Sequence, residues 1–317
     1  MSQTTLDQTS MGNKSANSGL ERFFSNLEIG DILMWGIMAI FVIVTLFPFW
    51  WVVRTALTNP DAVYSNVASM TPVETTTQNF ERVLGLIDPT ELAETSTNIS
   101  AGELKFWLYM RNSLIVATLI TVGQTIFSAM AAYAFARFEF PFRDQIFIIY
   151  LSGLMVPAIV LFIPNFVLIR QLGLIGTFVG IVAPVFFMTP FAVFFMRQFY
   201  LSLNNDLIEA AKLDGATAFG IFWRIALPLI RGPLLTLALL TFIASWNEYL
   251  WPLLVGRDED VRVLTVALSI FRSQTPQGAP DWAGLMAGTV VSMVPTTMLF
   301  IFFGRKVVDS IQFSGFK

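Results

Sequence analysis

Long apolar runs dominate this chain and leave it few ways to fold. The first run, from Ile32 to Val53, is about as long as a helix needs to be to cross the hydrocarbon core of a bilayer. It is too long for the core of a signal peptide and has no clear small-residue cleavage site, so we expect an uncleaved anchor. Backbone polar groups in a membrane must be satisfied within the segment, so such runs predict helices. We expect five further spans, at 113–136, 146–169, 178–196, 234–255 and 282–303.

The predicted fold is an all-α polytopic membrane protein with six transmembrane helices. Only 13% of the residues are charged, against about 25% in soluble domains. Six crossings put both termini on one side, and a slight excess of Lys and Arg favours the cytoplasmic side. Residues 1–30 are then a cytoplasmic tail, disordered and then amphipathic, and 31–317 form the transmembrane domain. This domain includes an extracytoplasmic loop at 54–112 and a cytoplasmic loop at 197–233.

The residue types and motifs that the sequence lacks exclude several kinds of catalytic and binding site. The chain has no cysteine and no histidine, which excludes disulfides, thiolate metal sites and imidazole bases. It has neither a basic patch for nucleic acid nor the G-x-x-x-x-G-K-[ST] loop that binds nucleotide phosphates. We therefore expect no catalytic residue, metal or cofactor in this chain. An ion-coupled secondary transporter remains a remote alternative, but it predicts inverted repeats and broken helices, and neither is visible in the sequence.

Proline and small residues predict how the helices bend and pack. Pro157 and Pro164 lie in the third run and Pro295 lies in the last. Prolines at such positions bend helices and free backbone carbonyls. Small residues four apart allow close helix contact, and they occur as Gly284 with Gly288 and as the series Ser128, Ala132 and Ala136.

The loop between the fourth and fifth runs carries more pattern than a connector needs. In DLIEAAKLDGATAFGIFWRIALPL, Asp206 can cap a short helix while Glu209 reaches back to it, as in a capping box. Gly215 can end that helix in a left-handed conformation. A second helix then presents an apolar face made of Phe219, Phe222, Trp223 and Ala226. We predict a helix–glycine–helix unit whose small, polar first half can enter a groove on another protein.

The same loop has the residues Glu209-Ala210-Ala211, Gly215 and Ile225-Ala226-Leu227-Pro228. In this pattern it resembles the signature loop of the inner-membrane permeases of bacterial ABC importers. Where that family often has proline before the loop helix, this chain has Asn204-Asn205, and asparagine can also start a helix. Three other segments resemble the carbohydrate permeases, most closely the smaller permease of maltose- and glucoside-type transporters. They contain Asn112-Ser113-Leu114 with Ala136-Arg137, the stretch Met155 to Thr177, and Trp246 to Leu254.

The resemblance implies a non-catalytic permease subunit of the bacterial inner membrane that imports a di- or oligosaccharide or a glucoside. A polyol, a glycerophosphodiester or another small solute is the alternative substrate. ATP and Mg would bind to a separate ATPase dimer. The first helix of the signature loop would be the coupling helix, which enters a cleft of that ATPase. Its contact residues would be Glu209, Ala210, Ala211, Asp214 and Gly215. The other implied partners are a second homologous permease and a periplasmic or lipid-anchored solute-binding protein.

One charged residue in the fifth run predicts where the substrate passes. Glu248 is a carboxylate within a span, and such groups are costly unless they face protein or water. Asn247 and Trp251, four residues apart, are expected on one helical face. Carboxylate, amide and indole groups suit the hydroxyls and ring faces of sugars. The hypothesis is a substrate path formed by Asn247, Glu248, Tyr249 and Trp251. The alternative is that these residues bond neighbouring helices or form a gate.

Overall fold

The computed structural model describes residues 29–65, 67–88, 99, 104–272 and 280–312. Every regular element in these residues is a helix, which agrees with the predicted all-α fold. The predicted tail at 1–30 lies almost wholly outside the described residues. The chain divides into two units, Met1–Arg54 and Thr55–Lys317.

Helix α2 (Ile29–Ala56) provides the described structure of the first unit. From Leu33 to Trp50 its side chains are almost all apolar and are exposed on all sides, with Phe41 at 71% and Ile43 at 66% exposure. Such a helix is suited to lipid rather than to water. Its segment Leu33–Ala56 is long and apolar enough to cross a membrane, as predicted for the first run.

In the second unit, α6 is a single long helix and most other spans are bent. Helix α6 (Phe106–Arg137) begins earlier than the predicted residue 113. Helices α17 (Trp282–Ser292) and α18 (Val294–Gln312) follow one another at the last run. By length and composition, three helices of the described chain can cross a membrane, or up to six if each bent pair is one span. The first two bent pairs are α7 (Arg143–Ser152) with α8 (Ala158–Gln171), and α9 (Phe178–Phe186) with α10 (Pro190–Ser202). The third consists of α12 (Ala218–Ile221) to α13 (Leu227–Leu229), followed by α14 (Arg231–Trp246).

The bends lie where proline interrupts the helical hydrogen bonds. Pro157 separates the two halves of the third run, which meet at 96°, as predicted, whereas Pro164 lies inside α8 and does not break it. Because proline has no N–H and restricts the residue before it, a helix ends there easily. The fifth run was predicted as one helix over 234–255, and this is wrong. Helix α14 ends at Trp246 and α15 (Leu250–Val255) starts after a break. Broken helices were not visible in the sequence, and this break is one that the sequence analysis missed.

Small residues allow the helices of the second unit to approach closely. Ala129 and Ala132 of α6 are fully buried in one cluster with Val193 and Met196 of α10. A Cβ added at Gly288 of α17 would lie 2.4 Å from the side chain of Leu268. Glycine therefore allows the side chain of Leu268 to pack directly on α17 where it meets α16 (Leu264–Arg272). The packing role predicted for these small residues is confirmed.

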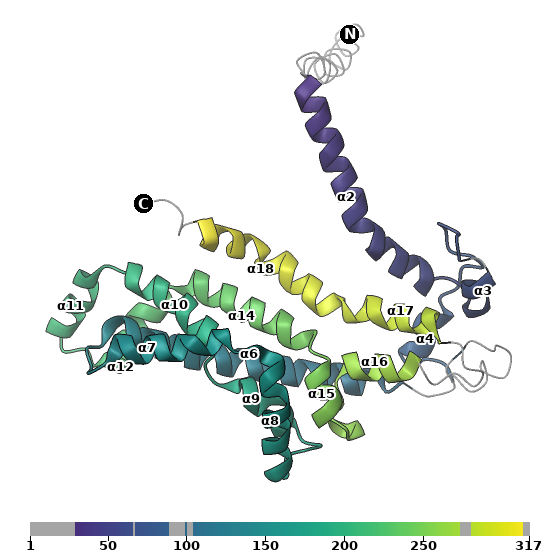
Figure 1. Ribbon diagram of the computed structural model, residues 1–317. Coiled ribbons are helices and arrows are strands. Elements are labelled where there is room, and N and C mark those ends of the chain that lie inside the picture. The colour runs from purple at the N-terminus through teal and green to yellow at the C-terminus, as the bar shows by residue number, and fades with distance from the viewer. Residues whose placement is uncertain (1–28, 66, 89–98, 100–103, 273–279, 313–317) are drawn as a thin grey trace, which may run out of the picture. The chain divides into compact units, whose positions relative to one another are not determined.

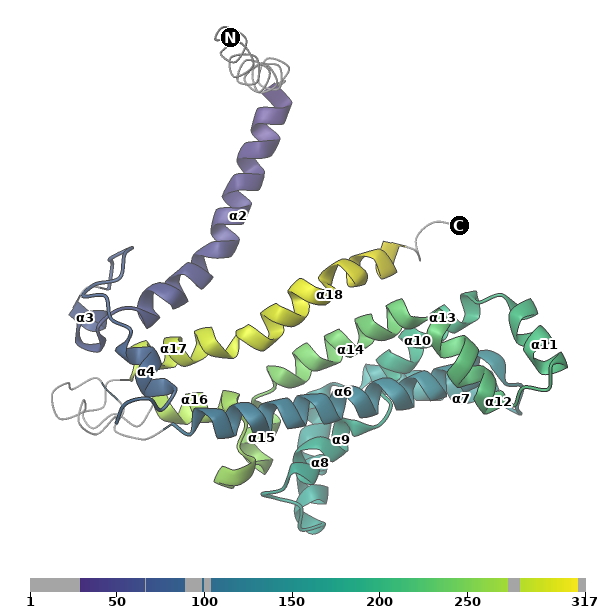
Figure 2. The same ribbon diagram turned by 180° about the vertical axis from the view of Figure 1, so that it is seen from behind.

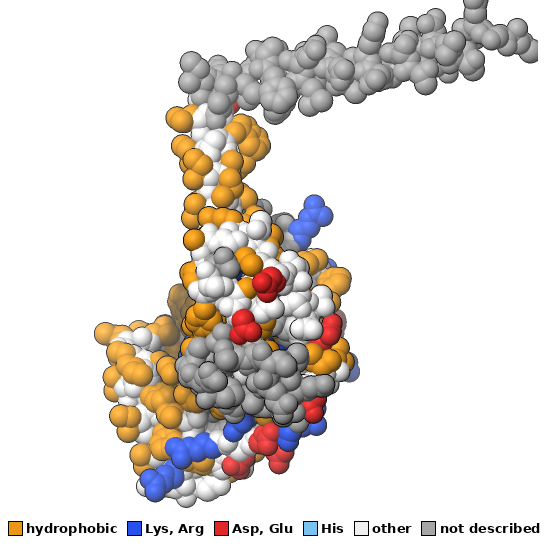
Figure 3. Space-filling model, turned by 90° about the vertical axis from the view of Figure 1, so that its right-hand side faces the viewer, with side chains coloured by type: hydrophobic (Ala, Val, Ile, Leu, Met, Phe, Trp, Pro, Cys, Tyr) orange, Lys and Arg blue, Asp and Glu red, His pale blue; other side chains and the backbone are white. Residues whose placement is uncertain are grey.

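The long helix α6 runs between the two ends of the second unit, and each end is formed by different short helices (Figures 1 and 2). One end carries α3 (Pro60–Ser65), α4 (Gln78–Val83) and α16. In Figure 3, acidic and basic side chains gather along this end while hydrophobic side chains cover the neighbouring flank. The opposite end carries α11 (Asn205–Leu213) and α12. This arrangement is typical of a bundle whose polar ends lie on either side of a membrane.

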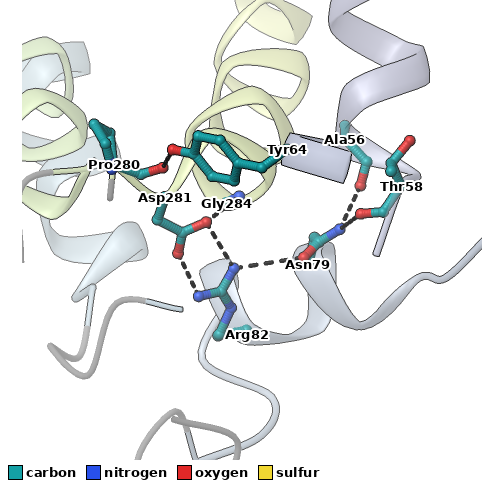
Figure 4. A network of polar contacts seen from close by, with 8 residues as sticks. All are labelled: Ala56, Thr58, Tyr64, Asn79, Arg82, Pro280, Asp281 and Gly284. Atoms are coloured by element: carbon teal, nitrogen blue, oxygen red, sulfur yellow. Dashed lines mark hydrogen bonds and ion pairs between the residues drawn. The ribbon is translucent and has the colours of Figure 1, made fainter. Parts of the chain in front are cut away.

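A buried ion pair fastens α4 to the start of α17 (Figure 4). The guanidinium of Arg82 binds both carboxylate oxygens of Asp281, and the two side chains are 1% and 0% exposed. Asp281 also caps α17, because its Oδ1 accepts a hydrogen bond from the backbone N–H of Gly284 at 2.7 Å. Asn79 donates to the carbonyls of Ala56 and Thr58 at 2.9 and 2.8 Å. Ala56 and Thr58, near the start of the second unit, are thus tied through α4 to the beginning of α17.

Candidate functional site

The loop before the fifth span folds as the predicted helix–glycine–helix unit, but its first cap differs. The side chain of Asn204, not Asp206, caps α11, and its Oδ1 accepts a hydrogen bond from the N–H of Asp206 at 2.9 Å. The predicted capping box of Asp206 and Glu209 is therefore wrong. Asn204 is extended and Asp206 is already in the first helical turn, where its charge interacts favourably with the helix dipole.

Gly215 ends α11 as predicted. Its φ is +79°, in the left-handed region that glycine adopts without steric cost. The N–H of Gly215 donates to the carbonyl of Lys212, and the N–H of Ala216 donates to that of Ala211, both at 3.0 Å. A Cβ at Gly215 would meet nothing within 4 Å. Within this chain, then, glycine is needed for its backbone conformation and not for space.

The second half of the loop is less regular than predicted. It passes from α12 through a π-helical turn (Phe222–Ala226) into α13. Pro228 lacks the N–H that an α-helix would donate to the carbonyl of Arg224, which favours this wider turn. The single apolar face predicted for this helix is wrong. Phe222 and Ala226 are buried, whereas Phe219 and Trp223 are 65% and 38% exposed.

The outer surface of this loop combines charged and large apolar side chains. Of the predicted coupling residues, Glu209, Ala210, Asp214 and Gly215 are exposed, whereas Ala211 is buried against the bundle. Three apolar side chains beside them are strongly exposed: Leu207 at 50%, Leu213 at 89% and Phe219 at 65%. We call Leu207, Glu209, Leu213, Asp214 and Phe219 the loop surface. Large apolar side chains exposed beside charged ones mark a site of contact with a protein partner or a membrane surface.

A cavity of about 650 Å³ lies in the second unit, between the long helix α6 and the bent spans. Most of its wall is apolar, and its polar side chains include Gln124, Asn165, Thr189, Ser245 and Glu248. Glu248 is the one charged side chain among the described residues that line it. The described residues contain no group of three or more acidic side chains placed to hold a metal ion. The cavity can therefore offer hydrogen-bond acceptors and one negative charge to a solute.

Glu248 lies in the break between α14 and α15 and not within a helix. Its Oε1 accepts a hydrogen bond from the N–H of Trp251 at 3.3 Å, and its backbone carbonyl accepts one from the hydroxyl of Thr265 at 2.9 Å. The side chain is exposed and lines the cavity. Ala244 and Ser245, four and three residues earlier, also line the cavity, so Glu248 continues the lining face of α14 beyond the end of that helix.

Trp251 also lines the cavity, but its indole N–H is used within the protein. It donates to the carbonyls of Ile181 and Gly180 at 3.1 and 3.3 Å. In a regular helix the carbonyl of Gly180 would accept from residue 184, and Pro184 has no N–H to give. The indole therefore satisfies a carbonyl that proline leaves free. The ring of Phe162 meets Trp251 edge-on, with centroids 5.5 Å apart.

The other two predicted path residues do not line the cavity. Asn247 ends α14, where its side chain donates to the carbonyl of Ile243 at 2.8 Å. The hydroxyl of Tyr249 lies 3.2 Å from that of Ser269 in α16. The prediction that Asn247 and Trp251 share a helical face is wrong because the helix breaks between them. The structure brings together only Glu248 and Trp251 of the four.

Residues 124–312 match the family model of the binding-protein-dependent transport system inner membrane component. The chain belongs to this family. The region that matches this inner membrane component includes the loop surface and most of the residues that line the cavity. Helix α2 and the Arg82 side of the buried ion pair precede it.

Two curated relatives of this inner membrane component match over most of their length. The arabinooligosaccharides transport system permease protein AraQ of Halalkalibacterium halodurans is 38% identical over 67% of this chain and 75% of its own. The sn-glycerol-3-phosphate transport system permease protein UgpE of Yersinia pestis is 30% identical over 88% of this chain and 96% of its own. A solved bacterial ABC transporter that imports the acidic polysaccharide alginate shares the fold. It has a TM-score of 0.73 at 23% identity and covers 87% of this chain and 96% of that one.

Sequence reasoning missed one polar contact in the wall of this inner membrane component. The side-chain amide of Gln124 in α6 donates to the hydroxyl of Thr189 at 2.8 Å, just before α10. Both residues line the cavity. The signal was present, because Gln124 is a polar side chain inside the second apolar run and such residues face protein or water.

Proposed function

We propose that this inner membrane component is the permease subunit of an ABC importer for a neutral sugar. ATP and Mg bind to a separate cytoplasmic ATPase dimer, and a second homologous permease completes the transmembrane path. A periplasmic or lipid-anchored binding protein delivers the sugar, and both termini of this chain are cytoplasmic. The observation that carries the proposal is the exposed helix–glycine–helix loop at one end of the bundle.

The loop surface has the properties that docking to an ATPase requires. Leu213 and Phe219 project apolar side chains, and Glu209 and Asp214 place negative charge beside them. An apolar anchor surrounded by polar groups is the usual make-up of a protein interface. Closure of the ATPase dimer would displace α11, and the bent spans would then shift between packed arrangements that open the path to either side.

The cavity wall favours a neutral solute over an anion. Its described lining has the carboxylate of Glu248 and no Lys or Arg. A carboxylate accepts strong hydrogen bonds from sugar hydroxyls but repels a phosphate or another carboxylate. The relative named for arabinooligosaccharides agrees with this choice. The second candidate substrate is a glycerol phosphate, because the relative named for that solute matches across 88% of this chain.

Transport by the complete importer in proteoliposomes tests the proposal. The chain is reconstituted with the permease, ATPase and binding protein encoded beside it, and uptake of labelled arabinooligosaccharide and sn-glycerol-3-phosphate is compared. We expect ATP-dependent uptake of the neutral sugar, and none when the ATPase carries an inactivating change in its phosphate-binding lysine. Uptake of glycerol phosphate instead would support the second candidate. Uptake without ATP or without the ATPase would refute the importer.

A further inference from the structure

One arginine at the end of α6 holds the start of α11. Arg137 donates through one guanidinium nitrogen to the side-chain oxygen of Asn205. Through the other it donates to the carbonyls of Tyr200 and Leu203, the latter at 2.7 Å. These carbonyls belong to the end of α10, where a helix leaves acceptors without partners. The planar fork of arginine can serve three acceptors at once, which a lysine ammonium at one point cannot match.

A second arginine makes the opposite connection. Arg197 of α10 donates from Nε to the carbonyl of Phe135 in the last turn of α6, at 3.3 Å. Its guanidinium lies 4.3 Å from the ring centroid of Phe147 in α7. Helices α6 and α10 thus each carry an arginine that binds the last turn of the other. The two helices are joined at the end from which α11 starts.

Beneath these arginines lies a cluster of aromatic rings. Tyr133 of α6 packs against Tyr200 of α10 and Phe222 of the π-helical turn, with centroids 5.3 Å apart in each case. Ile208 and Ala211 of α11 are buried in the same cluster. The apolar contacts seat α11 on the bundle, and Arg137 adds the hydrogen bonds that fix its first residue relative to α6.

Helix α6 also forms part of the cavity wall. Four of its residues line the cavity: Ser113, Val116, Ile120 and Gln124. From Arg137 to Gln124 the unbroken helix covers about 20 Å at ~1.5 Å per residue. Helix α6 continues unbroken through 32 residues. Helix α10 is also unbroken, from its cavity residues Phe191 and Ala192 to Ser202, and Arg137 joins the end of α10 to α6. A displacement of α11 that reaches α6 must therefore also move this wall of the cavity.

We propose that Arg137 is a positioning residue that transmits movement of α11 to α6 and so to the cavity. This inference rests on the proposed function of α11 as the ATPase contact. The prediction is specific: with Arg137 in place, α11 and α6 keep one separation through the nucleotide cycle. Without it, α11 follows the ATPase and α6 does not.

Distances between spin labels in the purified importer complex test this. The chain has no cysteine, so cysteines replacing Met130 in α6 and Lys212 in α11, both exposed, are labelled uniquely when the partner subunits are used as cysteine-free variants. Distances are measured without nucleotide and after trapping with ATP, Mg and vanadate. We expect a narrow distribution with the same mean in both states for the parent. Arg137→Gln should broaden the distribution and shift its mean on trapping, and Arg137→Lys should restore part of the narrowing.

Two further variants complete the test. Arg143→Gln removes an arginine at the same end that pairs with its neighbour Asp144, and it should behave as the parent does. If Arg137→Gln does not assemble, Asn205→Ala removes one acceptor and should broaden the distribution less. Distributions of parental width in Arg137→Gln and Arg137→Lys, or in Asn205→Ala, overturn the inference. Failure of the ATPase to co-purify with the parent instead refutes the proposed function. The widths of the distance distributions measured without nucleotide, in the parent and in the variants, still decide the role of Arg137.

Discussion

The buried pair of Arg82 and Asp281 predicts a large and specific loss of local stability when one partner is removed. Asp281→Asn keeps a side-chain oxygen for the N–H of Gly284 but leaves the guanidinium of Arg82 buried without a counter-charge. Breaking such a pair from one side costs about 3–5 kcal/mol. Because each ~1.4 kcal/mol is a factor of ten, ~3 kcal/mol corresponds to opening roughly a hundredfold more often.

Hydrogen exchange of the purified protein measures this opening directly. We expect amides of α4 and of the first turn of α17 to exchange roughly a hundredfold faster in Asp281→Asn, and those of α10 to be unchanged. Arg82→Met should also accelerate exchange at α4, because the carboxylate of Asp281 then loses both bonds from the guanidinium and its counter-charge.

The double variant decides whether the two residues act as a pair. Combining Arg82→Met with Asp281→Asn removes both charges. The free energy of local opening that the double variant loses should therefore be well below the sum of the losses in the two single variants. Glu259→Gln is the matched control, since the ion pair of Glu259 with Lys105 is about half exposed and should not affect α4. Additive losses, or single variants that exchange within threefold of the parent, would refute the reasoning.

Four further predictions concern the loop, the cavity and the outer turn. Gly215→Val puts a branched side chain at φ +79°, so membrane levels should stay normal while uptake and ATPase co-purification fall; parental uptake with an intact complex would contradict this. Glu248→Gln should raise the half-saturating sugar concentration about tenfold, because hydrogen bonds to charged groups are stronger, and an equal change of maximal rate for every sugar would count against it. Trp251→Ala should reduce assembly of the complex, measured by yield in detergent, because α15 loses its bonds to α9. Hydrogen bonds from Lys105 and Tyr109 lower the pKa of Glu259; the stabilisation is present above the ordinary pKa of ~4.3 and lost as pH falls through the lowered value. The protection of amides around Glu259, measured relative to the intrinsic exchange rate at each pH, should then be the same at pH 7 and at about pH 5.

The helices and the loop unit could be predicted from the sequence because their causes are local. A run of apolar residues such as 113–136 can satisfy its backbone in a membrane only as a helix. Gly215 follows a short helical pattern, and glycine is the residue that ends helices in the left-handed conformation. Pro157 has no N–H, so the bend in the third run follows from one residue.

The cap of α11 and the break after α14 could not be predicted exactly, because the sequence offers alternatives there that differ little in local free energy. Asn204 and Asp206 are both good caps, and the preceding α10 determines which of them is extended where α11 begins. In the run at 234–255, Pro252 has no N–H for the carbonyl of Glu248, which weakens a continuous helix at that point. The break at Asn247 to Tyr249 is stabilised from outside as well, by bonds to Thr265 and Ser269.

The contacts on which the function depends join residues far apart in the chain, and only the tertiary structure decided them. Arg82 and Asp281 are 199 residues apart, Trp251 and Gly180 are 71 apart, and Arg137 and Asn205 are 68 apart. Hydrophobic periodicity reports which face of a segment is buried and not which segment covers it. A buried arginine, indole or carboxylate is stable only with a partner at hydrogen-bonding distance. That partner is determined by how the helices pack, and in this bundle the packing brings the ends of α6, α10 and α11 together.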